Sequence, residues 1–355
     1  FPRQAWGTIA GMRRGARVAG WAVVAVVAAG CGDASHDEPA PGPEPAAPWR
    51  TSSDPVETSG LIWAGGSIVH LSEGTTIDLG DPVKTYVVAG DGIYFFPAES
   101  EDEIASVGLE ERELLFADAD GSVTGTGLIL VASSLTASPD GRYLAGLDMT
   151  IGDQDRYGTR LATARVFDLE TGEEVLRTSE GMGDTGEDDL SVLYENVRLA
   201  VTLTDDTAYV EAARDVIAYD LATGEGEVLP EDEDPPTVPE GPEAADSPDG
   251  EWTISDSRDL RDSVTSTDGE TVTPRPGTDR WILDFWVDDR TVVGVAVSGP
   301  GRGPKVDPRD TTTLMTCTVP SGECDVLAAS TGQLVVYPRT LAPDAGVYLQ
   351  SGGAS

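Results

Sequence analysis

Few residues of this chain could act in acid–base or nucleophilic chemistry. The sequence has two histidines, His36 and His70, so a Ser-His-Asp or Cys-His mechanism would depend on one of them as its base. His36 lies among prolines and acids, and His70 lies in a strand-like run where an ordinary packed side chain is expected. Neither a phosphate-binding glycine loop nor a zinc-ligand spacing occurs in the sequence. The sequence therefore predicts no catalytic site of these kinds.

Carboxylates are the other source of chemistry. Asp and Glu number 63 against 23 Lys and Arg, which gives a formal net charge of -40. Two carboxylates at a set distance suffice for glycoside hydrolysis, but spacing in the sequence does not select a pair. A carboxylate-dependent carbohydrate-active enzyme therefore stays open as an alternative. The same charge repels the phosphates of nucleic acid, which is not an expected partner.

Two further features could bind ligands. Asp118, Asp120 and Gly121 match part of a calcium-binding loop, but the remaining ligands do not follow at alternating positions. We favour a structural turn there, with Ca²⁺ as the alternative and no other cofactor expected. Trp281 and Trp286, with Trp63 and Trp252, could stack on sugars, but aromatic residues on propeller strands more often fill the space between blades.

The amino-terminal segment has the pattern of an export signal. Met12, which we take as the true start, is followed by arginines at positions 13, 14 and 17 and then by the apolar run 18–29. As a helix this run would span about 18 Å, whereas the hydrocarbon core of a bilayer is about 30 Å thick. Residues 1–30 are therefore predicted to be a cleaved signal peptide and not a membrane span.

The end of this run, Ala28-Ala29-Gly30-Cys31, resembles the bacterial lipobox. The resemblance implies that Cys31 becomes a lipidated amino terminus, although Ala28 stands where leucine is commoner. Two or more acyl chains suffice for stable anchoring. We therefore expect an extracytoplasmic lipoprotein of the cell envelope, held on the outer face of the cytoplasmic membrane. An ordinary secretory signal with an unmodified cysteine is the alternative.

Codon-related composition points to a source. Lysine occurs only at positions 84 and 305 and asparagine only at position 196. Such avoidance is typical of GC-rich codon usage, so the sequence resembles an actinobacterial-type lipoprotein.

Residues 31–60 after the signal are rich in Pro, Ala and acids and cannot bury enough surface to fold, so they are predicted to be a disordered tether. The folded domain is expected over residues 61–355.

Two series of turns alternate along this domain. The first has glycines at 74, 121, 172, 224, 269 and 322, at spacings of 47, 51, 52, 45 and 53. A period of about 50 residues is typical of propeller blades. The second series has its clearest members at Ser138-Pro139-Asp140-Gly141 and Ser247-Pro248-Asp249-Gly250, with weaker members near 92, 206, 289 and 345. Two hairpins per period predict four strands per blade, and six of each predict six blades.

The Ser-Pro-Asp-Gly motif resembles that of the TolB-like and WD-repeat-like propeller families. The resemblance covers residues 60 to 350 and rests on two good copies of the motif. The expected fold is all-β, a six-bladed β-propeller of four-stranded antiparallel blades, with a final blade built from both ends of the domain. A seven-bladed ring or a two-sheet sandwich is the alternative.

The two remaining cysteines test the predicted hairpins. Cys317 stands five residues before Gly322, and Cys324 stands two after it. The same offsets from the turn give Phe167 with Glu174, so each pair should occupy facing positions on a hairpin. Facing residues lie close enough for a disulfide, and an extracytoplasmic location favours its oxidised form. A disulfide between Cys317 and Cys324 is predicted, and a metal site there would lack a nearby histidine.

The binding site is expected on the face opposite the turns. In a four-strand meander both turn series share one face, so long connections open on the other, where a rigid scaffold presents them. These connections are residues 97–112, 151–160, 177–190, 225–246 and 298–311. The candidate binding residues are Asp153 and Asp155, together with Arg302, Lys305 and Arg309, which form the only basic cluster after the signal.

These observations predict a membrane-anchored propeller that acts as a non-catalytic binding or scaffold module. The expected partner, besides the membrane that holds the lipid anchor, is an envelope protein, a peptide or a glycan. The alternative is the carboxylate-dependent enzyme, as a glycosidase-like propeller.

Lipidation is directly testable. When cells expressing the chain are fed a clickable fatty acid, the protein is expected to be labelled, because acylation of Cys31 follows from the lipobox pattern. The Cys31→Ala variant serves as the control and should carry no label. An unlabelled parent protein, or label that survives this substitution, would rule the anchor out.

Overall fold

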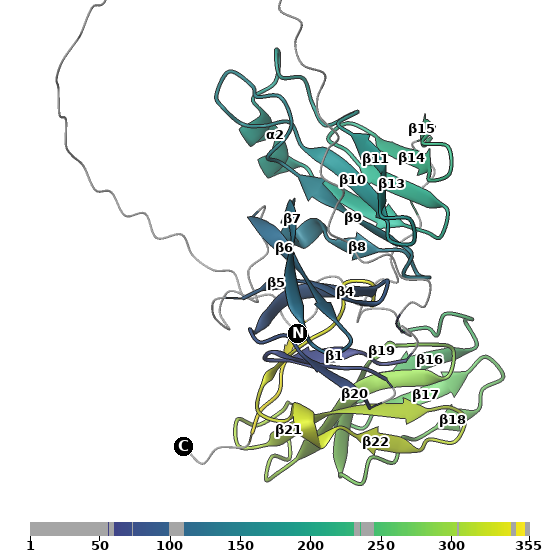
Figure 1. The fold of residues 1–355 in the computed structure, drawn as a ribbon. Helices are drawn as coiled ribbons and strands as arrows, with labels where there is room; N and C mark the ends of the chain where they lie inside the picture. Colours follow the sequence, from purple (N-terminus) through teal and green to yellow (C-terminus); the bar gives the residue numbers. More distant parts are fainter. Residues whose placement is uncertain are drawn as a thin grey trace, which may run out of the picture. The chain divides into compact units, whose positions relative to one another are not determined.

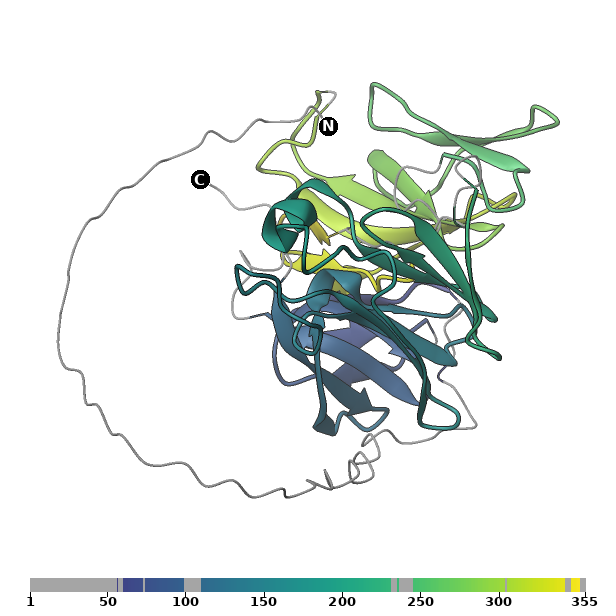
Figure 2. The ribbon, with the colours of Figure 1, turned by 90° about the horizontal axis from the view of Figure 1, so that it is seen from above.

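The computed structural model describes residues 56, 60–72, 74–98, 110–230, 235, 245–303, 305–341 and 346–351. These residues belong to one unit, Pro45–Ser355. The predicted signal peptide, Cys31 and nearly all of the predicted tether lie outside the described residues. Within them the strands form six antiparallel sheets, taken in chain order around the domain (Figures 1 and 2). The fold is an all-β, six-bladed β-propeller, as the turn series predicts.

The first three blades contain the amino-terminal half of the fold and the last strands of the chain. Blade 1 is β24 (Gly346–Tyr348), β23 (Leu334–Val336), β1 (Trp63–Gly65), β2 (Ile68–His70) and β3 (Thr76–Asp78). Blade 2 is β4 (Val83–Ala89), β5 (Gly92–Pro97), β6 (Glu111–Asp118) and β7 (Val123–Val131). Blade 3 is β8 (Thr136–Ala137), β9 (Tyr143–Asp148), β10 (Thr163–Asp168) and β11 (Glu173–Thr178).

The other three blades follow in order. Blade 4 is β12 (Ala200–Leu203), β13 (Thr207–Glu211), β14 (Val216–Asp220) and β15 (Gly226–Val228). Blade 5 is β16 (Trp252–Ser255), β17 (Ser263–Ser266) and β18 (Thr271–Val272). Blade 6 is β19 (Arg280–Trp286), β20 (Thr291–Ser298), β21 (Thr311–Thr318) and β22 (Cys324–Val326). Short helices are η1 (Ala132–Ser134), α2 (Leu190–Asn196) and η2 (Ala328–Ser330).

The turn motifs are built as their residue types suggest. The Ser138 hydroxyl donates to Asp140 Oδ1 at 2.6 Å, and the same oxygen accepts from the backbone N–H of Arg142 at 2.9 Å. Gly141 has φ of 72°, which a residue with a Cβ rarely adopts. The second good copy repeats the pattern, with Ser247 donating to Asp249 at 2.6 Å. The Ser138 motif joins β8 to β9, and the Ser247 motif joins the bridged residue Asp246 to β16.

Blade 1 combines the two ends of the domain, as predicted. β1 pairs antiparallel with β23, with Ala64 opposite Val336 and Gly65 opposite Val335. In Figure 1 this blade brings purple and yellow parts of the chain together. The expectation of four strands in every blade is wrong in two places. Blade 1 has five strands because β24 adds to the free edge of β23, and blade 5 has three plus an isolated bridge between Asp246 and Thr253.

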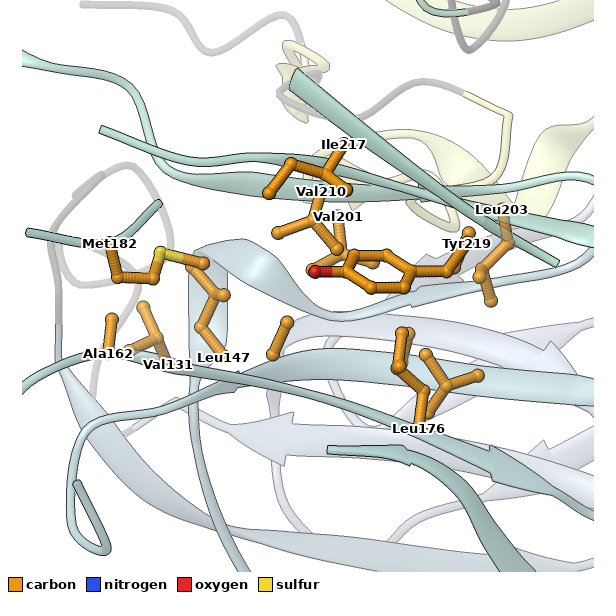
Figure 3. Close-up of a cluster of buried hydrophobic side chains, with 14 of the residues drawn as sticks. Val131, Leu147, Ala162, Leu176, Met182, Val201, Leu203, Val210, Ile217 and Tyr219 are labelled. Atoms are coloured by element: carbon orange, nitrogen blue, oxygen red, sulfur yellow. The ribbon is translucent and has the colours of Figure 1, made fainter. Parts of the chain in front are cut away.

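Apolar side chains from neighbouring blades fill the space between the sheets. Leu147 and Leu176 of blade 3 face Val210, Ile217 and Tyr219 of blade 4 in one buried cluster (Figure 3). Trp252, Trp281 and Trp286 lie in the cluster between blades 5 and 6. These tryptophans therefore pack between blades, as the sequence favoured. His70 is likewise a packed strand residue, stacked on Trp63 with ring centroids 3.8 Å apart.

The first strands of the blades gather at the centre. β4 contacts β8, β8 contacts β12, and β23 contacts β4.

In the part of the chain that the structure describes, no helix is both long and apolar enough to cross a membrane.

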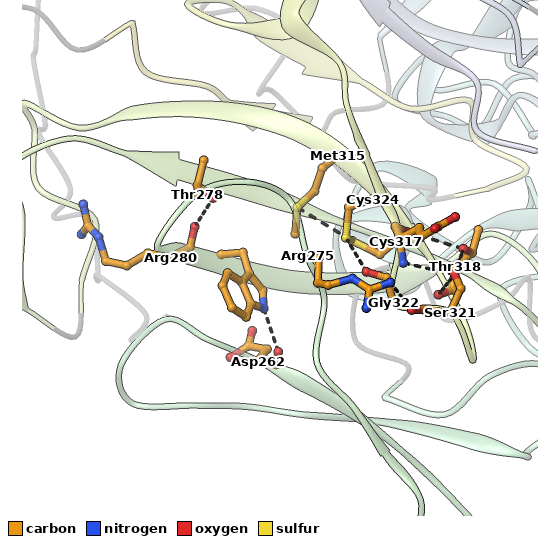
Figure 4. Close-up of a disulfide and its surroundings, with 12 residues drawn as sticks. Asp262, Arg275, Thr278, Arg280, Met315, Cys317, Thr318, Ser321, Gly322 and Cys324 are labelled. Carbon is orange, nitrogen blue, oxygen red and sulfur yellow. Dashed lines mark hydrogen bonds between the residues drawn. A yellow bond between two sulfur atoms is a disulfide. The ribbon is translucent and has the colours of Figure 1, made fainter.

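A disulfide joins Cys317 and Cys324, which occupy facing positions on β21 and β22 (Figure 4). The two positions used as templates face each other in the same way, since Phe167 is paired with Glu174. The turn that the disulfide closes rests on blade 5, where the Arg275 side chain donates to the carbonyl of Ser321 at 2.8 Å. The predicted pairing is confirmed, and it staples a hairpin that also joins two blades.

Removal of this bridge should weaken the fold modestly. The double variant Cys317→Ala and Cys324→Ala, made in a Cys31→Ala chain, is expected to lose about 2 to 3 kcal/mol of unfolding free energy, because the bridge closes a short loop. Urea unfolding measures the difference, which should shrink when a reductant is present. Two titratable thiols in the unreduced, denatured Cys31→Ala parent would contradict the assignment.

Candidate functional site

The two turn series lie on one face of the propeller and are tied together there. In four blades a backbone N–H in a turn of the first series donates to a carbonyl in a turn of the second series. These bonds run from Leu169 to Arg142, Leu221 to Asp206, Thr267 to Glu251 and Val319 to Arg290, all at 2.9 Å. We call this side the turn face and the opposite side the loop face. Because this bond repeats, the turns of these four blades are arranged alike on the turn face. Differences between the blades therefore lie on the loop face.

Over blades 3 and 4 the described residues of the loop face form a folded projection. We call it the lobe, and it consists of residues 149–162, between β9 and β10, and residues 179–197, between β11 and β12. The first segment folds back on itself, with the N–H of Asp155 donating to Thr159 and that of Leu161 donating to Asp153. The second segment ends in α2, whose N-terminal cap is Asp189.

Asp155 joins the two segments of the lobe. Its Oδ1 accepts from the backbone N–H groups of Tyr157 and Thr159 at 2.8 and 2.9 Å, and its Oδ2 accepts from Leu190 at 2.9 Å. Burial acts to raise the pKa of Asp155, but the bonds from Leu190, Thr159 and Tyr157 together outweigh it and hold the pKa below its usual value. Asp155 is therefore a structural carboxylate at the base of the lobe.

Buried side chains anchor the lobe to the blades. Met182, Leu190 and Tyr194 belong to the apolar cluster between blades 3 and 4, where Figure 3 shows Met182 above Ala162. The Tyr194 hydroxyl accepts from the N–H of Ala162 at 3.0 Å. On the second segment, Asp188 accepts from Arg214 of blade 4 at 2.9 Å. The lobe is thus fixed to blades 3 and 4 by packing and hydrogen bonds.

The outer surface of the lobe exposes apolar side chains. Tyr157 is 59% exposed, Val192 is 54% exposed and Ile151 is 45% exposed. The Arg156 guanidinium lies over the Tyr157 ring, 4.7 Å from its centroid. The lobe carries eight carboxylates against two arginines, and all of these carboxylates except Asp155 are at least partly exposed. These three are among the nine large apolar side chains that are exposed in the described residues, so the lobe carries a third of them.

The predicted site residues fall in two separate places. Asp153 is exposed and Asp155 is buried, and both lie in the lobe of blade 3. Arg302, Lys305 and Arg309 are exposed and lie on the connection between β20 and β21 of blade 6. The structure therefore places the acidic and basic candidates on different blades.

The basic cluster is less available than its sequence suggests. Arg309 forms two hydrogen bonds with the Asp307 carboxylate, at 2.8 and 2.9 Å, and this pairing holds the pKa of Asp307 far below its usual value. Asp310 is fully buried and accepts from Arg280 at 2.8 Å. These pairs shape the connection, and although all three cations are exposed, Arg309 is already paired within it.

Metal binding has little basis in the described residues, among which no group of three or more His, Cys, Asp or Glu could hold an ion. Asp118 Oδ1 accepts from the backbone N–H groups of Asp120 and Ser122, at 3.0 and 2.9 Å. This geometry is that of a structural turn. The turn borders an open depression of about 540 Å³ whose other wall includes Asp78 and Asp81 of the turn face.

Three features of the site were not predicted from the sequence. The helix α2 was missed, although Asp189 followed by Leu190, Leu193 and Tyr194 has the cap and the spacing of a short amphipathic helix. The exposed positions of Tyr157 and Val192 carry no local signal, because exposure depends on the packing of the lobe. The bulge at Asp284 of β19, on another blade, carries no local signal either.

Comparisons with known proteins place the chain by fold only. No protein-family model and no curated protein matches it. It is similar to the structure of TolB from Acinetobacter baumannii, with 11% identity and a TM-score of 0.33, over 75% of this chain and 63% of that one. It is also similar to a prolyl endopeptidase structure, with 16% identity and a TM-score of 0.34, over 82% of this chain and 50% of that one.

A third similar structure is the N-terminal domain of Nup159, with 11% identity and a TM-score of 0.27, over 79% of this chain and 62% of that one. The chain spans less than two thirds of each of these three structures. The β-propeller fold is shared by binding scaffolds and enzymes, so function must be argued from the site.

The role of Asp155 gives a stability prediction. Asp155→Ala should loosen the lobe by about 1 to 3 kcal/mol, since it leaves several buried N–H groups unpaired. Hydrogen exchange at the Leu190 amide should be faster in this variant. Because its folded-state pKa is lowered, the stabilisation by Asp155 is present above its unfolded pKa of about 3.9 and is lost as pH falls through the folded value.

The matched control for this experiment is Asp153→Ala, two residues away on an exposed side chain. It should change stability by no more than about 0.5 kcal/mol. Equal exchange rates at Leu190 in the two variants would show that Asp155 does not join the segments.

Proposed function

We propose that this chain is a lipid-anchored, extracytoplasmic binding module that recognises a protein or peptide through the lobe on its loop face, without catalysis. The observation that carries the proposal is the lobe itself. Its exposed Tyr157, Val192 and Ile151 stand on segments fixed by buried Leu190 and Tyr194. Exposed apolar groups on a rigid support lose little entropy when they bind, which favours recognition.

The charge of the lobe selects the chemistry of the partner. Its seven carboxylates that are at least partly exposed, against two arginines, favour a basic surface or segment. Aromatic side chains such as Tyr157 commonly supply the strongest contacts of protein interfaces. A basic segment that carries an apolar residue would therefore pair with the carboxylates of the lobe and pack against its exposed apolar side chains.

Binding without chemistry accords with the use of the buried acids. Asp148 and Asp168 are paired with arginines, at 3.0 and 2.7 Å, and Asp155 accepts backbone hydrogen bonds. A carboxylate with such partners holds structure and is poorly suited to donate or accept a proton in catalysis. The alternative of a glycosidase, which needs two available carboxylates, has no specific observation in its favour.

The proposed location rests on the sequence. The lipobox-like segment that ends at Cys31 and the Pro-rich residues 31–60 would place the propeller outside the cytoplasmic membrane on a tether. The Cys317–Cys324 disulfide fits an oxidising compartment. A tethered module of this kind would search the envelope for its partner while it stays at the membrane.

Site-specific crosslinking in living cells tests the proposal. A photo-reactive residue at position 157 is expected to capture a discrete partner through a basic segment. Tyr157→Ser should weaken the binding of that partner by tenfold or more, because truncation of an aromatic anchor costs about 2 kcal/mol. Position 348 is the matched control, since Tyr348 is 62% exposed but lies on blade 1. The same abundant neighbours at both positions would contradict the proposal.

A further inference from the structure

An open depression of about 540 Å³ lies where the β6–β7 turn of blade 2 meets the end of β3, the edge strand of blade 1. Residues 76–81 form one wall of this depression, and residues 119–121 together with Val123 form the other. The depression lies outside the lobe, at a junction between two blades. Its form can therefore be compared with a junction between other blades.

The junction between blades 5 and 6 is built in the same way. There Gly322 of the β21–β22 turn lies against the carbonyl of Thr273, which follows β18, the edge strand of blade 5. Gly121 of the β6–β7 turn lies likewise against the carbonyl of Asp78 at the end of β3. A Cβ on these two glycines would lie 2.8 and 3.0 Å from the respective carbonyl oxygens. The two junctions therefore have equivalent positions.

An arginine bridges the junction between blades 5 and 6. Arg275, two residues after Thr273, donates from its backbone N–H to the carbonyl of Gly322 at 2.9 Å. Its guanidinium donates to the carbonyl of Ser321 at 2.8 Å (Figure 4). The equivalent position between blades 1 and 2 is Gly80, where an added Cβ would meet no atom within 4 Å. The depression thus corresponds to the place of the Arg275 side chain at the other junction.

The depression offers acceptors and counter-charges for a guanidinium. Asp81 and Asp120 are exposed, and in the described residues their carboxylates form no hydrogen bond or ion pair. The carbonyl of Asp120, which corresponds to that of Ser321, accepts no backbone hydrogen bond from these residues either. Val123 is 40% exposed and provides an apolar surface for the methylene groups of a long side chain.

The free edge of β3 favours an extended polypeptide as the carrier of this guanidinium. β3 pairs with β2 alone, and the N–H of Leu79 donates to the carbonyl of Ser67 at 2.8 Å. Because bonded pairs alternate along an antiparallel ladder, the N–H and C=O groups of Thr76 and Asp78 point away from β2. In the described residues no backbone group bonds to them. An edge of this kind pairs with an extended segment of another chain.

We propose that this depression binds an arginine side chain from an extended segment of a partner protein. The guanidinium donates to the carbonyl of Asp120, as Arg275 does to that of Ser321. Its charge is met by the carboxylates of Asp81 and Asp120. Lysine is the weaker ligand, because it is a point charge without the planar donor group. The site is separate from the lobe, and the proposal does not depend on the lobe's function.

NMR titration of the isotope-labelled Cys31→Ala chain with acetyl-Gly-Arg-Gly-amide tests the site. At about 0.15 M salt, which screens general attraction to an acidic protein, the peptide is expected to shift the amide signals of Gly80 and Gly121. The same peptide with citrulline, an uncharged isostere of arginine, should bind at least about tenfold more weakly, because charged hydrogen bonds are the stronger ones. The glycines of the probe give the apolar side chains of the lobe nothing to pack against.

Matched variants assign the binding to the depression. The double variant Asp81→Asn and Asp120→Asn should reduce the affinity for the arginine peptide about tenfold, because both counter-charges are lost. Asp268→Asn should leave the affinity unchanged, since Asp268 precedes the turn glycine of blade 5 as Asp120 precedes that of blade 2 and is also exposed. These substitutions are on the surface and keep the side-chain volume, so the variants are expected to fold. If the double variant does not fold, the citrulline peptide decides the question.

A peptide with lysine in place of arginine separates recognition of the guanidinium from attraction of charge alone. It is expected to bind at least about threefold more weakly than the arginine peptide. The absence of binding, shifts at the lobe instead of at Gly80 and Gly121, or unchanged affinity in the double variant would overturn the proposal. Equal affinity for the citrulline or the lysine peptide would overturn it as well.

Discussion

The pairing of β1 with β23 is the contact on which the rest of the structure depends. It joins the first described strand to one of the last, and without it both strands would present unpaired N–H and C=O groups at a sheet edge. Both neighbouring blades also rest on this junction. Tyr86 of blade 2 donates from its hydroxyl to the carbonyl of Val336 at 3.3 Å, and Phe285 of blade 6 packs against Tyr337. The centre of the propeller is therefore assembled from both ends of the chain.

Aspartate side chains have different structural roles on the two faces of the propeller. On the turn face Asp140 and Asp249 accept hydrogen bonds from nearby Ser and backbone groups, which is why a strongly acidic chain can form compact turns. In the lobe Asp155 does the same over a longer distance and joins two segments. Asp153, two residues away, is exposed. The acidity of the sequence therefore divides into carboxylates that build the fold and carboxylates that lie on its surface.

How far the sequence could predict the structure depends on how local each interaction is. The turn motifs are self-contained, so Ser138 and Asp140 reveal their hairpin, and the register of Cys317 with Cys324 follows from the turn. The pairing of Arg309 with Asp307 is equally local, yet its effect on an apparent basic cluster was missed. The exposure of Tyr157 and the bulge at Asp284 arise from packing between segments and blades, and no short pattern encodes them.

A formal charge of -40 does not by itself make this protein selective for cations. Charges on the surface are screened beyond about 10 Å at ordinary ionic strength, and they attract any cation alike. An exposed apolar side chain on a rigid support differs, because it contributes to binding only where a group of the partner packs against it. The exposed acids of the lobe thus favour encounter with basic partners, whereas discrimination among them falls to the apolar side chains of Tyr157, Val192 and Ile151.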